Sequence, residues 1–275
     1  MNEVCLKNTQ YSSAENKKGL YDIAIVTPSS DSIVVFMHGY MGFKDWGCWN
    51  LAMNFFTDKG VNFAKLNVTH NGTTLNSPID FEDLDAFSKN SYWKEYCDLN
   101  SFLSHLETVY SMKKIHLIGH SRGGGIVLLS AHHPSVTSIT TWAGISSIEK
   151  RFPAKEKLNE WKETGVYFVE NGRTNQFMPH SFSQYEEYLS HKASLSIEKA
   201  CRKNSKPICI IHGTSDTSVS IIEGQQLSEW TTTELIQIEE TNHTFDAKHP
   251  WKEKSLPSAL LKACEYTLQF ISSIK

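Results

Sequence analysis

A serine, an aspartate and a histidine occur at positions that could together form a nucleophilic centre. Ser121 is the middle residue of Gly119-His120-Ser121-Arg122-Gly123, a G-x-S-x-G motif. A serine hydroxyl becomes an effective nucleophile only when a base removes its proton, and a carboxylate must orient that base. The chemistry that such a set of residues could perform is acyl transfer, with a covalent intermediate on the serine.

The residues around Ser121 predict a strand, a sharp turn and a helix. Residues 115–118 are a short apolar run of the kind that forms a buried strand, and residues 124–133 form a mostly apolar helix that Pro134 ends. Glycines two positions before and after Ser121 remove side chains that would collide in so sharp a turn. This pattern predicts a nucleophile elbow, which lifts the hydroxyl clear of the sheet.

The order of residues along the chain indicates which histidine and which acid act with Ser121. In folds with a nucleophile elbow the order is serine, acid, histidine. His243 follows the expected strand 234–238 directly, whereas His249 lies in a polar loop with no element to position it. Asp216 lies just after the preceding expected strand, in HGTSDTSV. We therefore expect His243 to be the base and Asp216 the acid that orients it.

Two backbone N–H groups are expected to form an oxyanion hole. One belongs to Arg122, the residue after the nucleophile, at the start of the helix. The other belongs to Tyr40, in the loop that follows strand 32–37, where Gly39 and Gly42 allow a close approach.

The elements that must position these residues alternate between strands and helices. The expected strands are residues 20–27, 32–37, 61–68, 115–118, 136–143, 207–211 and 234–238. The expected helices are residues 45–60, with Asp45 as N-cap, then 91–110, 124–133, 220–230 and 257–271. Residues 70–87 are expected to form a polar loop. Alternation of this kind predicts an α/β fold with a doubly wound, mostly parallel sheet, whose site lies at the carboxyl ends of the strands.

One region interrupts the alternation, and we expect it to be an insertion at residues 147–204 within a single domain of residues 1–275. It should contain a helix, a hairpin and another helix, with Asn171-Gly172 as a two-residue hairpin turn. Aromatic residues of the insertion, together with Tyr40, are candidate substrate contacts: Trp161, Tyr167, Phe168 and Phe177. Because strand side chains alternate, only one of Tyr167 and Phe168 can face the pocket.

Composition narrows the class of protein. The 275 residues are 40% hydrophobic and 21% charged, with a formal net charge of −3, so neither nucleic acid nor an anionic membrane is an expected partner. No apolar run approaches 18 residues, and residues 1–18 lack the apolar core of a signal peptide. The six cysteines lack CxxC spacing, which predicts reduced thiols in a cytoplasmic protein and no zinc site. Acyl transfer on a serine needs no metal and no cofactor, so none is expected.

With these motifs in place, the sequence resembles the α/β-hydrolase superfamily. The resemblance rests on SIVVFMHGYMGFKDWGCW, GHSRGG, HGTSDTSV and ETNHTF, and it spans about residues 20–271. Among members of the superfamily the chain is most similar to small bacterial cinnamoyl esterases, dienelactone-hydrolase-like proteins and serine aminopeptidases. It departs from many members after strand 61–68, where it has NVTHNGTT in place of a D-x-x-G-x-G-x-S loop. The resemblance implies the same triad, Ser121, Asp216 and His243, and the same oxyanion residues, Tyr40 and Arg122.

The leading hypothesis is a serine esterase that acts on a small-molecule ester; the oligomeric state stays open. A serine aminopeptidase or amidase would need carboxylates in the insertion to bind a free amine, and Glu163, Glu170, Glu186 and Glu187 are available. An acyltransferase is a further alternative, because an alcohol can compete with water for the same intermediate. A non-catalytic ligand binder on this fold is the alternative from a different class.

Overall fold

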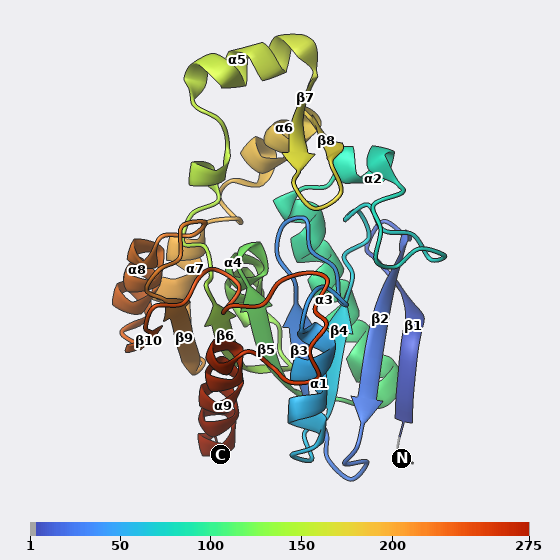
Figure 1. Ribbon diagram of the computed structural model, residues 1–275, viewed down its shortest axis with the longest axis vertical. Coiled ribbons are helices and arrows are strands. Elements are labelled where there is room, and N and C mark those ends of the chain that lie inside the picture. Colours follow the sequence, from blue (N-terminus) through green and yellow to red (C-terminus); the bar gives the residue numbers. More distant parts are fainter. Residues whose placement is uncertain (1–3, 275) are drawn as a thin grey trace.

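The computed structural model describes residues 4–274, and a mixed sheet crosses the whole molecule (Figure 1). Within those residues the sheet has eight strands. Their spatial order is β1 (Val4–Ser12), β2 (Lys18–Ile25), β4 (Phe63–Leu66), β3 (Ser32–Met37), β5 (Lys114–His120), β6 (Val136–Trp142), β9 (Ile208–Gly213) and β10 (Leu235–Ile238). Only β2 runs antiparallel to its neighbours, and the other pairings are parallel. The predicted α/β class and mostly parallel sheet are confirmed.

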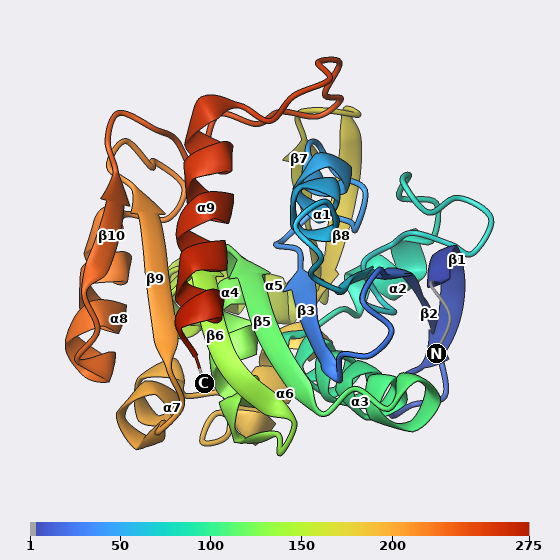
Figure 2. The same cartoon turned by 90° about the horizontal axis from the view of Figure 1, so that it is seen from below.

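Helices cover both faces of this sheet, as Figure 2 shows from below. One face carries α1 (Trp49–Thr57) and α9 (Ser258–Ser273), which pack on a core that contains Phe36 and Trp142. The other carries α3 (Tyr92–Tyr110), α4 (Arg122–Leu129), α7 (Ile197–Lys203) and α8 (Ile221–Thr231). The central strands are buried on both faces, which is why they appear in the sequence as continuous apolar runs.

The strand β1 was not predicted, because its sequence lacks the apolar pattern of a buried strand. Cys5 and Lys7 are both exposed, and most of its other side chains also face solvent. β1 is the edge strand beyond β2, a position at which polar side chains are expected. Tertiary pairing with β2, rather than local pattern, therefore makes this segment a strand.

Asp45 is not the N-cap of α1 as predicted; the helix begins at Trp49. The Asp45 carboxylate instead joins Asp22, Lys44 and Lys65 in a cluster in which each lysine pairs with both aspartates. The side chains of Asp22, Lys44 and Lys65 are at most 1% exposed, so each charge needs these partners. The cluster fixes the chain just after the loop that contains Tyr40.

The loop predicted at residues 70–87 contains a short helix, α2 (Leu84–Ser88). Its residue Phe87 packs with Phe81, Phe43 and Met178 in a small core separate from those of the sheet. The apolar side chains at positions 81, 84 and 87 have helical spacing, but the polar residues around them obscured it.

The insertion follows β6 and contains α5 (Lys155–Thr164), β7 (Val166–Asn171), β8 (Gln176–Ser181) and α6 (Ser183–His191), then α7. Figure 1 shows α5, the hairpin and α6 above the carboxyl ends of the strands. Asn171 pairs with Gln176, so the hairpin loop is residues 172–175 and the predicted two-residue turn is wrong. The Asn171 side chain accepts a hydrogen bond from Arg173 N–H, and Asn175 takes the left-handed conformation that closes the longer loop.

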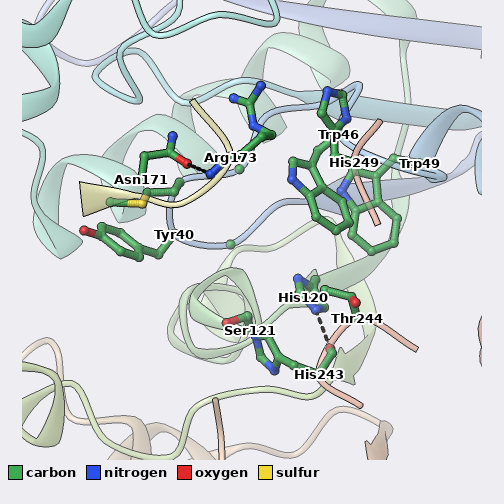
Figure 3. Close-up of a pocket in the computed structure, with 13 residues that line it drawn as sticks. Tyr40, Trp46, Trp49, His120, Ser121, Asn171, Arg173, His243, Thr244 and His249 are labelled. Carbon is green, nitrogen blue, oxygen red and sulfur yellow. Dashed lines mark hydrogen bonds between the residues drawn. The ribbon is translucent and has the colours of Figure 1, made fainter. Parts of the chain in front are cut away.

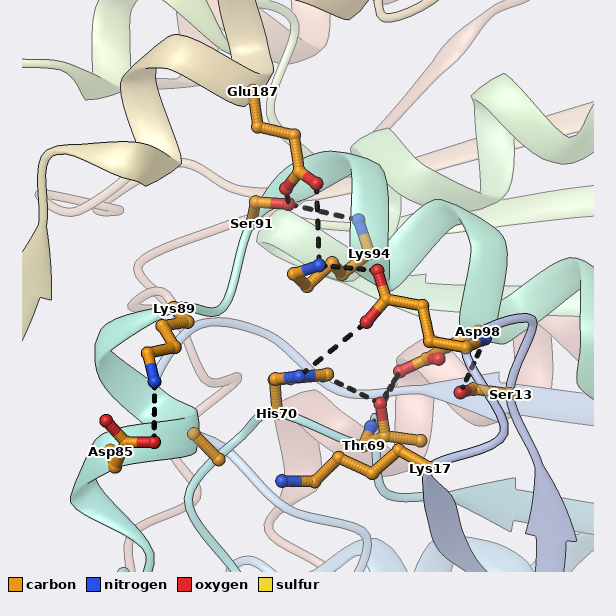
Figure 4. Close-up of polar contacts among 12 residues, drawn as sticks. Ser13, Lys17, Thr69, His70, Asp85, Lys89, Ser91, Lys94, Asp98 and Glu187 are labelled. Atoms are coloured by element: carbon orange, nitrogen blue, oxygen red, sulfur yellow. Dashed lines mark hydrogen bonds and ion pairs between the residues drawn. The ribbon is translucent and has the colours of Figure 1, made fainter.

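Charged side chains tie the insertion to the rest of the molecule (Figure 4). Glu187 of α6 accepts a hydrogen bond from the hydroxyl of Ser91, the N-cap of α3, and lies 3.4 Å from Lys94. Lys94 also pairs with Glu15 in the turn between β1 and β2, at 2.6 Å. Three segments far apart in the sequence are therefore linked at one end of α3.

No helix among residues 4–274 combines the length and the apolar character that crossing a membrane requires.

Candidate active site

Ser121 lies between β5 and α4 with a strained backbone. Its φ is 57° and its ψ is −119°, a conformation that a serine adopts only when its surroundings impose it. A Cβ on Gly119 would lie 2.3 Å from the Gly123 carbonyl oxygen, and one on Gly123 would lie 2.5 Å from that of His38. Both glycines are therefore required by the turn that presents Ser121 at the carboxyl edge of the sheet.

Asp216 and His243 follow the adjacent strands β9 and β10, and they are in direct contact. The Nδ1–H of His243 donates to Oδ2 of Asp216 at 2.7 Å. The other carboxylate oxygen accepts from the backbone N–H groups of Ser218 (2.8 Å) and Val219 (2.9 Å). These bonds fix the carboxylate, and the carboxylate in turn fixes the imidazole ring.

The surroundings of Asp216 favour its ionised form. Burial by itself raises the pKa of this carboxyl, but hydrogen bonds from His212 and His243, and from the backbone N–H of Val219, outweigh burial and hold the pKa well below its usual range. His212 Nε2 lies 3.3 Å from Oδ2 and donates to the Val219 carbonyl at 2.9 Å. His212 was not predicted as a site residue; its one signal in the sequence is its position at the end of an expected strand.

His120 holds the backbone next to the imidazole of His243. Its Nε2–H donates to the His243 carbonyl oxygen at 2.9 Å, and the two rings lie 4.8 Å apart. Burial lowers the pKa of His120 to about 3, so the ring stays neutral. His120 was part of the motif in the sequence, but this contact across 123 residues was not predictable.

Two cavities meet at Ser121 and His243. Figure 3 shows the first of them, with Ser121 and His243 next to each other. The first, of about 260 Å³, we call the loop-side cavity; it is also lined by Tyr40, Trp46, Trp49, Asn171, Arg173 and His249. The second, of about 490 Å³, we call the insertion-side cavity; it is also lined by Tyr40, Tyr92, Arg122, Arg151, Phe152, Trp161 and Tyr167. A molecule with two arms could place its reacting carbon at Ser121 and one arm in each cavity.

Tyr40 and Arg122, whose backbone N–H groups are expected to bind an oxygen, both line the insertion-side cavity next to Ser121. Neither of these N–H groups donates a hydrogen bond to any residue between 4 and 274. A Cβ on Gly39 would lie 2.9 Å from the Cβ of Ser121, so the loop lies directly against the serine. His38 Nδ1–H donates to the Gly39 carbonyl at 2.8 Å and stabilises the loop in this position.

The hairpin of the insertion presents alternate side chains to the site. Tyr167, Val169, Met178 and His180 lie on the inner face, and Phe168 and Phe177 lie on the outer face. Phe168 is 58% exposed and Phe177 is 64% exposed, and neither of these two predicted substrate contacts lines a cavity at Ser121. Tyr167 stacks on His180, which hydrogen-bonds with the Tyr40 hydroxyl at 2.8 Å. Of the predicted contacts, Tyr40, Trp161 and Tyr167 line the insertion-side cavity.

His249 was expected to lack a positioning element, and the structure corrects this. Its Nδ1 accepts a hydrogen bond from Gly47 N–H at 2.8 Å, and its ring stacks on Trp46. Trp46 and His249 both line the loop-side cavity (Figure 3). Because Nδ1 is used as an acceptor, His249 is not oriented by a carboxylate as His243 is.

Solved structures with the same fold cover almost the whole chain. Est1E from Butyrivibrio proteoclasticus matches with a TM-score of 0.66 and 14% identity over 98% of this chain and 100% of that one. A putative hydrolase from Agrobacterium vitis S4 matches with a TM-score of 0.71 and 15% identity over 98% and 100%. Mouse alpha/beta hydrolase domain-containing protein 10 matches with a TM-score of 0.66 and 16% identity over the full length of both chains.

No protein-family model and no curated protein sequence matches the chain. The structural matches, together with the sheet order and the elbow at Ser121, give this chain the α/β-hydrolase fold.

Proposed function

We propose that this chain is a serine hydrolase that cleaves carboxylic esters. The 2.7 Å hydrogen bond between His243 Nδ1 and Asp216 Oδ2 supports this most directly, because it leaves Nε2 as the proton acceptor at the cavity that Ser121 also lines. The strained elbow and the two free N–H groups add the nucleophile and the oxyanion site that acyl transfer requires.

The proposed reaction has two halves. His243 takes the hydroxyl proton as Ser121 attacks the ester carbonyl, and the N–H groups of Tyr40 and Arg122 stabilise the oxyanion. His243 then gives the proton to the leaving alcohol, which produces an acyl-enzyme. Water, activated by the same imidazole, releases the acid and restores Ser121. Asp216 stays ionised and stabilises the imidazolium form in each half.

We further propose that residues 147–204 act as a cap that selects the substrate, within one catalytic domain. Trp161, Tyr167 and His180 line the insertion-side cavity, and no hydrogen bond joins them to Asp216 or His243. One solved structure of Est1E has ferulic acid, an aromatic acid, bound to it. For this chain we propose that an aromatic arm of the substrate can occupy the insertion-side cavity.

The cavities give no support to the aminopeptidase alternative. Among residues 4–274, no aspartate or glutamate lines either cavity. Glu163, Glu170 and Glu186 are exposed, and Glu187 is engaged by Ser91 and Lys94. A free amine bound in either cavity would therefore find no carboxylate among the described residues of its walls.

Hydrolysis of p-nitrophenyl butanoate tests the proposal. The wild-type protein should release p-nitrophenol, and a fluorophosphonate should label Ser121 alone. Ser121→Ala should lose both properties with its circular dichroism spectrum unchanged. Labelling at another serine, or the absence of turnover in the wild-type protein on any ester, would contradict the proposal and favour a ligand-binding role.

A further inference from the structure

Arginine side chains line both cavities next to Ser121. Among the described residues, no aspartate or glutamate lines either cavity. Arg173 lines the loop-side cavity, but its guanidinium lies over the rings of Phe43 and Phe81 and points away from Ser121 in Figure 3. Arg122 and Arg151 line the insertion-side cavity together. Their positions make that cavity the one in which charge can act on a bound molecule.

Arg122 is buried, and its one charged partner among residues 4–274 is Glu95. The side chain follows the nucleophile, and the residue is 8% exposed. Its Nε lies 3.1 Å from Glu95 Oε1, and its Cζ lies 3.7 Å from the centre of the Tyr92 ring. Its two terminal nitrogens make no hydrogen bond to any residue between 4 and 274, and Glu95 does not line the cavity. The guanidinium therefore keeps N–H donors that no described residue uses, in a side chain that lines the cavity.

Arg151 and Tyr92 add further donors to the same wall. One terminal nitrogen of Arg151 pairs with Glu223, which does not line the cavity, while the buried Nε of Arg151 has no hydrogen-bond partner within the described chain. The Tyr92 hydroxyl also has no hydrogen bond to residues 4–274. Burial raises the pKa of Tyr92; the charges of Arg122 and Arg151 lower it, and the carboxylate of Glu95 raises it further.

The insertion-side cavity, of about 490 Å³, also has apolar walls, formed by Ile145, Phe152, Trp161 and Val219. The polar side chains of His180, Gln184 and Ser218 line it as well. Buried donors without acceptors cost free energy, and a guanidinium edge matches a carboxylate in geometry as well as charge. An apolar arm that ends in an anion would satisfy both the donors and the apolar walls.

We propose that the substrate ester carries a carboxylate on the arm that occupies the insertion-side cavity, and that Arg122, Arg151 and Tyr92 bind this carboxylate. The inference rests on the proposed esterase function and narrows its substrate class to half-esters of dicarboxylic acids or esters of carboxylate-bearing alcohols.

Matched pairs of esters test the inference on the wild-type protein. The first pair is p-nitrophenyl hydrogen adipate and the p-nitrophenyl ester of its half-amide, which differ in charge but hardly in shape. The second pair, 4-carboxyphenyl and 4-carbamoylphenyl hexanoate, places the same difference on the alcohol. In one of the pairs kcat/KM should be higher for the anion by about tenfold or more, as expected for hydrogen bonds to a charged group. A ratio near one in both pairs, with p-nitrophenyl butanoate still hydrolysed, would overturn the inference and leave the esterase proposal intact.

Binding measured without turnover separates the two proposals. Ser121→Ala should bind the anionic member of the preferred pair more tightly than its amide, again by about tenfold, in a calorimetric titration. The same preference in a protein that hydrolyses no ester would support the anion site and reject the esterase function. Equal affinities would reject the anion site.

Variants assign the preference to the arginines. Arg151→Gln, and the double variant Arg122→Gln with Glu95→Gln, should each lower the anion-to-amide ratio by about tenfold. The double variant removes a buried pair together, so no carboxylate is left unpaired. Tyr92→Phe, which removes only one hydroxyl, should lower the ratio by about threefold.

Arg202→Gln is the matched control, because Arg202 is an exposed residue of α7 that pairs with Glu198 and lines neither cavity. It should leave the ratio unchanged. Folded variants that keep the wild-type ratio, or a control that shifts it equally, would contradict the assignment.

Discussion

His120 Nε2 and the carbonyl oxygen of His243 lie 2.9 Å apart, so the residue before the proposed nucleophile holds the backbone of the proposed base. The contact joins the elbow to the loop after β10, two segments that are 123 residues apart in the sequence. Because the imidazole of His243 must reach Ser121 from this loop, the geometry of the whole site depends on that bond.

Replacing His120 should therefore impair turnover more than binding. We expect His120→Ala to lower kcat by about tenfold to a hundredfold, as a small misplacement of a catalytic group does, with little change in KM. His120→Gln, whose side-chain amide can donate to the same carbonyl, should recover much of the loss. Steady-state kinetics on p-nitrophenyl butanoate measures both. A rise in KM with unchanged kcat would show that His120 acts on substrate binding instead.

The triad residues should differ in their effects. Ser121→Ala and His243→Ala should each lower kcat by about 10⁴ or more, and Asp216→Ala somewhat less, because the oxyanion site and binding remain. The double variant of Ser121 and His243 should lose little more than either single one, since the two act as a unit. Additive losses would mean that they act independently.

Activity should rise with pH wherever deprotonation of His243 limits the rate, because a protonated imidazole cannot accept the hydroxyl proton. Asp216, with its pKa held below the usual range, stays ionised and should add no second step in this region. The profile of kcat/KM from about pH 5 to 8 measures this. A flat profile would indicate another base or a limiting step other than chemistry.

The two faces of the insertion hairpin provide a matched pair of variants. Tyr167 lines the insertion-side cavity, whereas its neighbour Phe168 faces outward. Tyr167→Ala should raise KM for bulky aromatic esters by about tenfold, through lost contact area, and affect acetate esters much less. Phe168→Ala should change neither. Equal effects of the two variants, or equal losses on acetate and aromatic esters, would contradict a role of the hairpin in selecting substrate.

Acid should destabilise the fold through its buried histidines. Burial lowers the pKa of His120 to about 3 and the pKa values of His38, His116 and His180 to about 4. The unfolded chain takes up these protons at the ordinary value of about 6.5, so between about pH 6.5 and 4 it binds more protons than the folded chain. The free energy of unfolding should therefore decrease as the pH is lowered through this range, by about 1.4 kcal/mol per pH unit for each such histidine.

Urea unfolding at pH 7, 6 and 5 measures this slope. Burial raises the pKa of Asp98 to about 7 and also raises the pKa of Glu95, and both carboxyls work in the opposite direction. They are two groups against five histidines, because burial lowers the pKa of His70 to about 4 as well. His116 lies away from the site and hydrogen-bonds with the Ser138 hydroxyl at 2.8 Å, so His116→Gln isolates one contribution. The variant should have a shallower slope. Stability that stays constant or increases from pH 7 to 5 would contradict the prediction.

The elbow, the central strands and the candidate site residues could be predicted from the sequence because they depend on local chemistry. The glycines around Ser121 mark the elbow because a Cβ at either position would collide with backbone, a constraint that holds within a few residues. Apolar runs identified the central strands because both faces of those strands are buried. The order of Ser121, Asp216 and His243 then followed from the topology of such sheets, and the structure brings the latter two into contact.

Tertiary structure decided what depends on contacts between distant segments. β1 has no apolar pattern of its own and becomes a strand by pairing with β2. The bonds from His120 to His243 and from Gly47 to His249 span more than a hundred residues and leave no periodic signal. Which of Tyr167 and Phe168 faces the cavity depends on the register and placement of a hairpin over the sheet, since alternation fixes only that they point opposite ways. The sequence contains Arg122 and Arg151 but does not show that they lie together. Only the packing of the folded chain brings both to one cavity, where no aspartate or glutamate of the described residues is among the lining residues.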